Sequence, residues 1–77
     1  MKLTYSNHWK FKRKYRKEIT DDLIVYAIKN SNAIKDKYWD DALNSISKIP
    51  ANGRKLKVVY KKIDNKNYKI ITAFWVD

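Results

Sequence analysis

The sequence has no cysteine, and it has only one proline, one glycine and one histidine among 77 residues. Without cysteine the chain cannot form disulfide bonds, a thiolate nucleophile, a zinc finger or an iron–sulfur cluster. One histidine with scattered aspartates does not supply the ligand cluster of a metal site, so we expect neither a metal nor another cofactor. Because glycine and proline are so scarce, no linker is visible, and residues 1–77 are predicted to form a single domain.

Long apolar runs are also missing from the sequence. The longest run, Leu23–Ile28, is far shorter than the roughly 20 residues that a membrane-spanning helix needs. The first five residues lack the apolar stretch of a signal peptide. We therefore expect a cytoplasmic protein that has no membrane partner.

Negative charge is scarce as well, because 8 Asp and Glu face 18 Lys and Arg, which gives a net charge of +10. Residues 1–20 carry seven cationic residues against one acidic residue, and residues 51–77 carry seven against two. Residues 21–50 are nearly neutral, with four lysines against five aspartates. If folding brings the two basic ends together, they form one positive surface. A polyanion is the predicted partner.

Two helices are predicted in the first 32 residues. The first covers about 8–17, after a capping residue at position 6 or 7, because Phe11 and Tyr15 lie four residues apart and share a face. The second begins after Thr20, a good N-cap that is followed by two aspartates where the helix dipole favours acidic residues. Its apolar stripe consists of Leu23, Ile24, Ala27 and Ile28.

The C-terminal third is predicted to be β-structure, and a short strand is predicted over 2–6. Residues 56–61 and 68–76 are rich in β-branched and aromatic side chains and flank a polar turn. When Ile63 pairs with Tyr68, the two faces of this hairpin differ in composition. The apolar face, predicted to be buried under the helices, carries Leu56, Val58, Ile71 and Ala73. The solvent-accessible face is predicted to carry Lys57, Lys61 and Thr72.

The segment before this hairpin has two possible structures. Asn52-Gly53 indicates a two-residue turn, and the preceding residues 44–50 would then be a strand. The spacing of Trp39, Leu43 and Ile46 also suits a short helix. We favour the strand because Asn-Gly is a strong hairpin signal.

Several short motifs resemble those of small RelE-like and BrnT-like toxins, and most closely a related uncharacterised family. The similar segments are residues 5–8, 19–22, 27–30, 53–60 and 70–75. The resemblance implies an α+β fold with two N-terminal helices packed on one face of a small antiparallel sheet. It also implies a metal-independent ribonuclease toxin that acts on RNA, in some cases on the ribosome, and an acidic antitoxin protein as partner.

Four residues are candidates for catalysis. His8 is the only side chain whose ordinary pKa lies near neutrality, so it can act as a general acid or base; a packed or capping histidine is the alternative. Arg16 and Arg54 can stabilise charge on a reacting phosphate. Thr72 can donate a hydrogen bond to phosphate, although threonine is also common in strands for packing reasons.

A second set of residues is predicted to bind nucleic acid. Six cations lie within residues 10–17 without an acidic residue, which is typical of a surface that follows phosphates; a merely solvated helix face is the alternative. The complete predicted binding set is Lys10, Lys12, Arg13, Lys14, Lys17, Lys55, Lys57 and Lys61.

Three functions agree with these observations. The leading hypothesis is an RNA-binding domain that can also be a ribonuclease, and the alternative is a non-catalytic nucleic-acid-binding module. A protein-interaction domain with incidental lysines is the third.

Of the tryptophans, Trp75 is assigned to the core, Trp39 is an exposed candidate for stacking on a base, and Trp9 fits either role.

Overall fold

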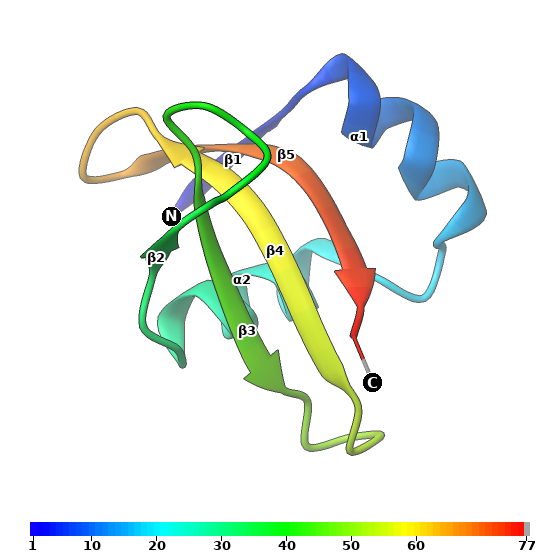
Figure 1. Ribbon diagram of the computed structural model, residues 1–77. Helices are drawn as coiled ribbons and strands as arrows, with labels where there is room; N and C mark the ends of the chain where they lie inside the picture. Colours follow the sequence, from blue (N-terminus) through cyan, green and yellow to red (C-terminus); the bar gives the residue numbers. More distant parts are fainter. Residues whose placement is uncertain (77) are drawn as a thin grey trace.

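The chain, described by a computed structural model over residues 1–76, forms one five-stranded sheet with two short α-helices (Figure 1). In chain order the elements are β1 (Lys2–Tyr5), α1 (Asn7–Lys12), a 3₁₀ helix (Arg13–Tyr15), α2 (Asp21–Lys29), β2 (Ile34–Lys35), β3 (Leu43–Lys48), β4 (Lys55–Lys62) and β5 (Asn67–Trp75). The strand order across the sheet is β1-β5-β4-β3-β2.

The sheet is mixed, so the predicted antiparallel sheet is wrong, although the α+β class is right. β1 pairs with β5 in parallel, and the other neighbouring strands are antiparallel. The reason lies in the connection: after β1 the chain passes through both helices and enters the sheet at the opposite edge, at β2. The antiparallel run from β2 to β5 then returns to β1, which places the first and last strands side by side (Figure 1).

The first helix is shorter than predicted and does not lie flat on the sheet. Ser6 caps it by accepting a hydrogen bond from the Trp9 N–H at 3.0 Å, and the α-helix ends at Lys12. A 3₁₀ turn follows, and Arg16 then leaves helical geometry with φ −131° and ψ 51°. This change of direction lets the Arg16 guanidinium reach back to β5, beside which α1 lies (Figure 1).

The second helix begins as the sequence indicates. The Thr20 hydroxyl accepts a hydrogen bond from the Leu23 N–H, and two aspartates occupy the first turn. The buried residues of α2 are Ile24, Ala27 and Ile28, which confirms three of the four stripe positions; Leu23 is partly buried at the edge of the core. The helix ends at Asn30, whose N–H bonds back to the Tyr26 carbonyl.

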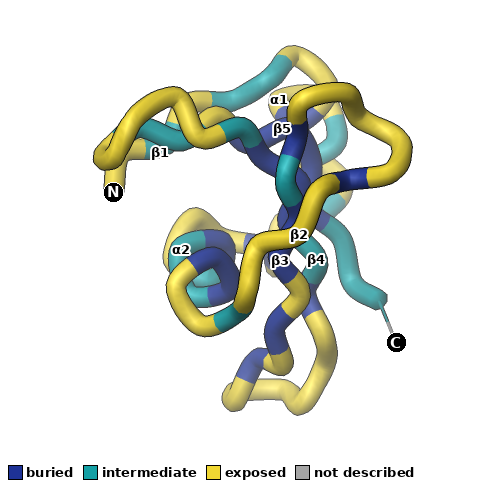
Figure 2. The backbone as a smooth tube through the Cα atoms, turned by 60° about the vertical axis from the view of Figure 1, so that its left-hand side comes forward, coloured by how far each residue is buried: buried dark blue, intermediate teal, exposed yellow. Residues whose placement is uncertain are grey.

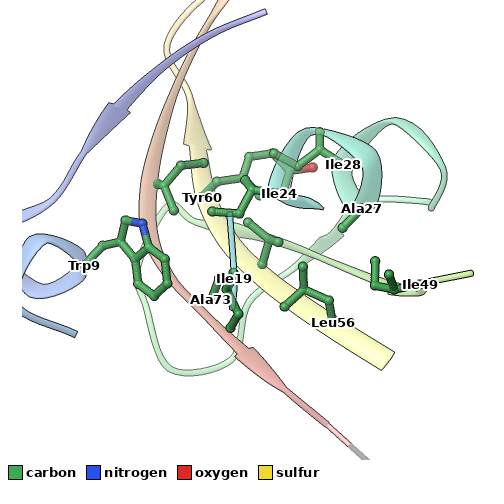
Figure 3. Close-up of a cluster of buried hydrophobic side chains, with 11 residues drawn as sticks. Trp9, Ile19, Ile24, Ala27, Ile28, Ile49, Leu56, Tyr60 and Ala73 are labelled. Atoms are coloured by element: carbon green, nitrogen blue, oxygen red, sulfur yellow. The ribbon is translucent and has the colours of Figure 1, made fainter. Parts of the chain in front are cut away.

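The core fills the space between α2 and one side of the sheet, and Trp9 enters it from α1 (Figure 3). Its members include Trp9, Ile19, Ile24, Ala27, Leu56, Val58, Tyr60, Ile70 and Ala73. Trp9 is only 1% exposed, so it belongs to the core and is not a stacking surface. Burying a side chain of this size stabilises the fold by roughly 2–3 kcal/mol.

The β4–β5 hairpin keeps the predicted register over half its length. Lys57 pairs with Phe74 and Val59 with Thr72, as predicted, but a register shift follows and Tyr60 pairs with Ile70. Ile71 is the extra residue of this bulge. It packs with Ala42 and Val59 on the side away from α2, so its predicted burial under the helices is wrong, whereas Leu56, Val58 and Ala73 are buried there as predicted.

The segment before β4 is the strand β3, and not a helix. The turn that follows is longer than the predicted two residues. The hairpin closes where the Ile49 N–H bonds to the Arg54 carbonyl at 2.8 Å, which leaves residues 50–53 as the loop. Gly53 adopts φ +69° there, and its N–H bonds to the Ile49 carbonyl at 2.8 Å. Proline at position 50 has no N–H to extend the ladder, which favours this wider turn.

Candidate nucleic-acid interface

The two sides of the sheet are covered differently. α2 lies on one side, and the loop of residues 36–42 crosses the other side near one end of the strands (Figure 2). We call this second side, away from α2, the open face. Strand alternation and the pairing register place on it Ile46, Lys48, Lys55, Lys57, Lys61, Lys69 and Phe74.

An aromatic ring with two cations near it lies on the open face. Ile46, Lys57 and Phe74 are neighbours across three strands. The Lys57 Nζ lies 5.7 Å from the centroid of the Phe74 ring, and the Arg16 guanidinium carbon lies 5.9 Å from the same centroid. Phe74 is partly exposed. This row can stack on a base while its cations contact the flanking phosphates.

A buried aspartate holds the 36–42 loop against the open face. The Asp36 carboxylate accepts hydrogen bonds from the Tyr38 and Trp39 N–H groups at 3.0 and 2.9 Å and from the Asn44 Nδ2 at 3.0 Å. Lys57 Nζ lies 4.0 Å from its Oδ1. Burial raises the pKa of the Asp36 carboxyl, but these hydrogen bonds and the Lys57 charge outweigh it, so the pKa is lowered and Asp36 is ionised.

Arg16 and Thr72, two of the candidate catalytic residues, lie together. The Arg16 Nη1 lies 3.3 Å from the Thr72 Oγ1 and 3.1 Å from the Ala73 carbonyl oxygen, to which it donates. β1 stops pairing with β5 at Ile70, and beyond that point Ser6 and Arg16 supply hydrogen bonds along the β5 edge. Thr72 is only 4% exposed, so its predicted accessibility is wrong because this edge is covered.

The other two candidate catalytic residues lie near different parts of β5. The exposed His8 ring contacts the Trp39 ring, with centroids 5.4 Å apart, next to the end of β1. Arg54 follows the β3–β4 turn, and its guanidinium lies 4.6 Å from the centroid of the Trp75 ring. Because Ser6 bonds to Ile70 and Leu56 pairs with Trp75, about 15 Å of strand separates these two regions. The structure therefore does not gather the four residues around one phosphate.

The basic N-terminal segment forms a second surface with exposed aromatic rings. Lys10, Arg13, Lys14 and Lys17 are exposed, and Lys12 is partly buried. Phe11 and Tyr15, 55% and 74% exposed, have ring centroids 5.6 Å apart. The predicted cations of this segment thus lie on α1, the 3₁₀ helix and the turn after it, whereas those of β4 lie on the sheet.

Sequence reasoning missed Asp36 and Asn44. Both are nine-tenths or more buried although they are polar, and they connect the 36–42 loop to β3. The only sequence signal was weak: Asn44 occupies the first strand position predicted before the Asn-Gly turn. Nothing indicated that Asp36, eight residues earlier, is its partner.

No known protein supplies a further guide to the site. No family model matches the chain, and no match was found among curated proteins or solved structures. Within residues 1–76, no group of three or more His, Asp and Glu side chains is placed to hold a metal ion. Over the same residues, no helix has the length and apolar character needed to cross a membrane.

Proposed function

We propose that this protein is a non-catalytic RNA-binding module that uses the open face of its sheet to bind a single strand in the cytoplasm. The observation that carries the proposal is the row of Arg16, Phe74 and Lys57, in which the two cations lie 5.9 and 5.7 Å from the centroid of a partly exposed ring. Such a row contacts a base and its phosphates together, whatever the sequence of the strand.

The charge on the open face supports a polyanionic ligand. Five lysines of β3, β4 and β5 alternate onto this side, and one of them, Lys57, lies 4.0 Å from the Asp36 carboxylate. That carboxylate is buried, and the positive charge of the Lys57 ammonium offsets its negative charge toward a phosphate at the surface. Binding of the lysines to phosphates releases counterions and is therefore strong at low salt.

The separation of the candidate catalytic residues favours binding over cleavage. Metal-independent cleavage of RNA needs a base, an acid and cations around one phosphate. His8 contacts Trp39, Arg54 contacts Trp75, and the Arg16 guanidinium is held by β5.

The experiment that tests the proposal is a salt titration of binding to a fluorescent RNA oligomer of mixed sequence. One triple variant changes Lys55, Lys61 and Lys69 to Gln, and its matched control changes Lys29, Lys62 and Lys66 to Gln. All six lysines lie outside the core, and both variants lose three charges.

We expect the open-face variant to bind at least tenfold more weakly at low salt. Its slope of log affinity against log salt should fall by about two, since each contact to a single-stranded phosphate contributes roughly 0.7. The control variant should keep most of the wild-type affinity and slope. Equal losses in both variants would contradict a role for the open face, and no binding by the wild type would contradict the whole proposal.

A further inference from the structure

A groove opens at the edge of the open face, where β2 joins β3. Its volume is about 290 Å³. Three of its lining side chains are large and exposed although they are apolar or aromatic: Ile34 is 58% exposed, Tyr38 87% and Ile46 44%. Exposed apolar side chains that gather around one hollow mark a binding site for a flat or apolar group.

The polar part of the groove is unusual because one buried acceptor has no partner. Asn44 lines the groove and is only 5% exposed. Its Nδ2 donates to the Asp36 Oδ1 at 3.0 Å, but its Oδ1 has no hydrogen-bond partner. The carboxylate fixes this orientation, since an ionised Asp36 can only accept and must therefore face the amide nitrogen. A buried oxygen without a donor is costly, so a ligand that brings a donor gains affinity.

Lysines complete the lining of the groove. Lys57 reaches it from the central row of the open face, and Lys35 and Lys37 come from β2 and the loop that follows. Because the Asn44 Oδ1 is itself covered, a ligand that reaches it must first displace neighbouring side chains. Cationic walls around an apolar hollow fit a planar ring that is linked to phosphate.

We propose that this groove is a nucleobase pocket that selects bases with an exocyclic amino group over uracil. The inference rests on the proposed function, because the base arrives as part of a single strand bound to the open face. Tyr38 and the two isoleucines contact the faces and edges of the ring, and the Asn44 Oδ1 accepts a hydrogen bond from the amino group. Adenine and cytosine present such a group, whereas uracil presents a carbonyl oxygen at the corresponding position. That oxygen and the Asn44 Oδ1 are both acceptors, so they cannot form a hydrogen bond with each other.

The decisive comparison changes only the ligand, so it does not depend on the folding of a variant. Affinities are measured by fluorescence anisotropy for eight-residue oligomers of rA, of purine riboside, of rC and of rU, at one salt concentration. Purine riboside differs from adenosine only by the absent amino group. We expect wild-type protein to bind rA over purine riboside, and rC over rU, by about five- to tenfold, which is the effect of one hydrogen bond to a buried acceptor.

Two protein variants locate the preference. Asn44→Leu should reduce both ratios to near one, provided that its circular dichroism spectrum matches the wild type. Lys69→Gln, on the open face outside the groove, should weaken all four oligomers by a similar factor and keep the ratios.

The remaining outcomes separate this inference from the proposed function. If the wild type binds all four oligomers equally and with a steep salt dependence, the nucleobase pocket is wrong and the RNA-binding face stands. A preference that persists in Asn44→Leu also overturns the pocket. If no oligomer binds, both proposals fail.

Discussion

The two sides of the sheet show how one set of strands can serve stability and binding at once. On the side of α2, β4 contributes Leu56, Val58 and Tyr60, which are at most 3% exposed. On the open face the same strand contributes Lys57 and Lys61, which are partly exposed. Strand alternation produces this contrast, and outside the buried cluster of Ala42, Val59 and Ile71 it leaves the open face free of the demand for close packing. Such freedom explains why cations and exposed aromatic rings can collect on the open face.

The largest effect that would distinguish the two sides is on stability. Ile70→Ala removes a side chain with 0% exposure from the core and should lower the free energy of unfolding by about 2–5 kcal/mol. Ile46→Ala makes the same chemical change at a 44% exposed position and should cost less than about 1 kcal/mol. Urea denaturation followed by tryptophan fluorescence measures both. Equal costs would mean that the open face is packed as tightly as the core.

If Ile70→Ala is unfolded at all urea concentrations, Ile70→Val replaces it in the comparison. It should cost about 0.5–1.5 kcal/mol, with Ile46→Val within error of the wild type. With either alanine or valine, the substitution at position 70 should lower the free energy of unfolding more than the same substitution at position 46.

A smaller effect concerns the aspartate that attaches the 36–42 loop to the open face. The pKa of Asp36 is lower in the folded protein than in the unfolded chain, so ionised Asp36 stabilises the fold above about pH 4, and this stabilisation is lost as the pH falls through the folded pKa. Asp36→Asn should cost about 1–2 kcal/mol at pH 7, because hydrogen bonds to a charged acceptor are replaced. The same substitution should also make the free energy of unfolding fall less between pH 5 and pH 2 than it does in the wild type.

The matched control for this prediction is Asp40→Asn, an exposed carboxylate of the same loop. Its unfolding free energy at pH 7 should stay within about 0.5 kcal/mol of the wild type. The free energy of unfolding is measured by urea denaturation at each pH. If it falls between pH 5 and pH 2 as steeply in Asp36→Asn as in the wild type, the role assigned to Asp36 is contradicted.

The smallest effect is expected for His8. Its ring contacts Trp39 and not the central row of the open face. His8→Ala should therefore change RNA affinity by less than about twofold, and wild-type protein should not cleave RNA in the presence of EDTA. Gel analysis of labelled RNA measures the second point. Cleavage in EDTA that disappears in His8→Ala would show that the protein is an enzyme.

Sequence reasoning predicted those features that depend on neighbouring residues. Thr20 and the aspartates after it locate the start of α2, because a helix cap acts within one turn. Alternation along β4 placed Leu56 and Lys57 on opposite sides, and that prediction needs no knowledge of the partner strand. The N-cap at Ser6 was one of two predicted positions for the same local reason.

The features that were mispredicted depend on distant residues. Nothing within 2–5 indicates that β1 pairs in parallel with β5, some 65 residues later. The bulge at Ile71 shifts one half of a hairpin whose local pattern is regular. The groove needs two side chains of β2, two of the 36–42 loop and Asn44 of β3, and no local pattern in the sequence shows that these three segments meet.

The most direct test of the central claim uses the isoleucine methyl groups, which lie on both sides of the sheet. Their δ1 signals are followed by NMR while an rA or rC oligomer is added to the methyl-labelled protein. The account predicts that Ile34 and Ile46, exposed beside the groove, shift strongly, whereas the buried Ile24, Ile28 and Ile49 stay in place. Large shifts confined to the α2 side, with Ile34 and Ile46 unmoved, would contradict an RNA-binding open face.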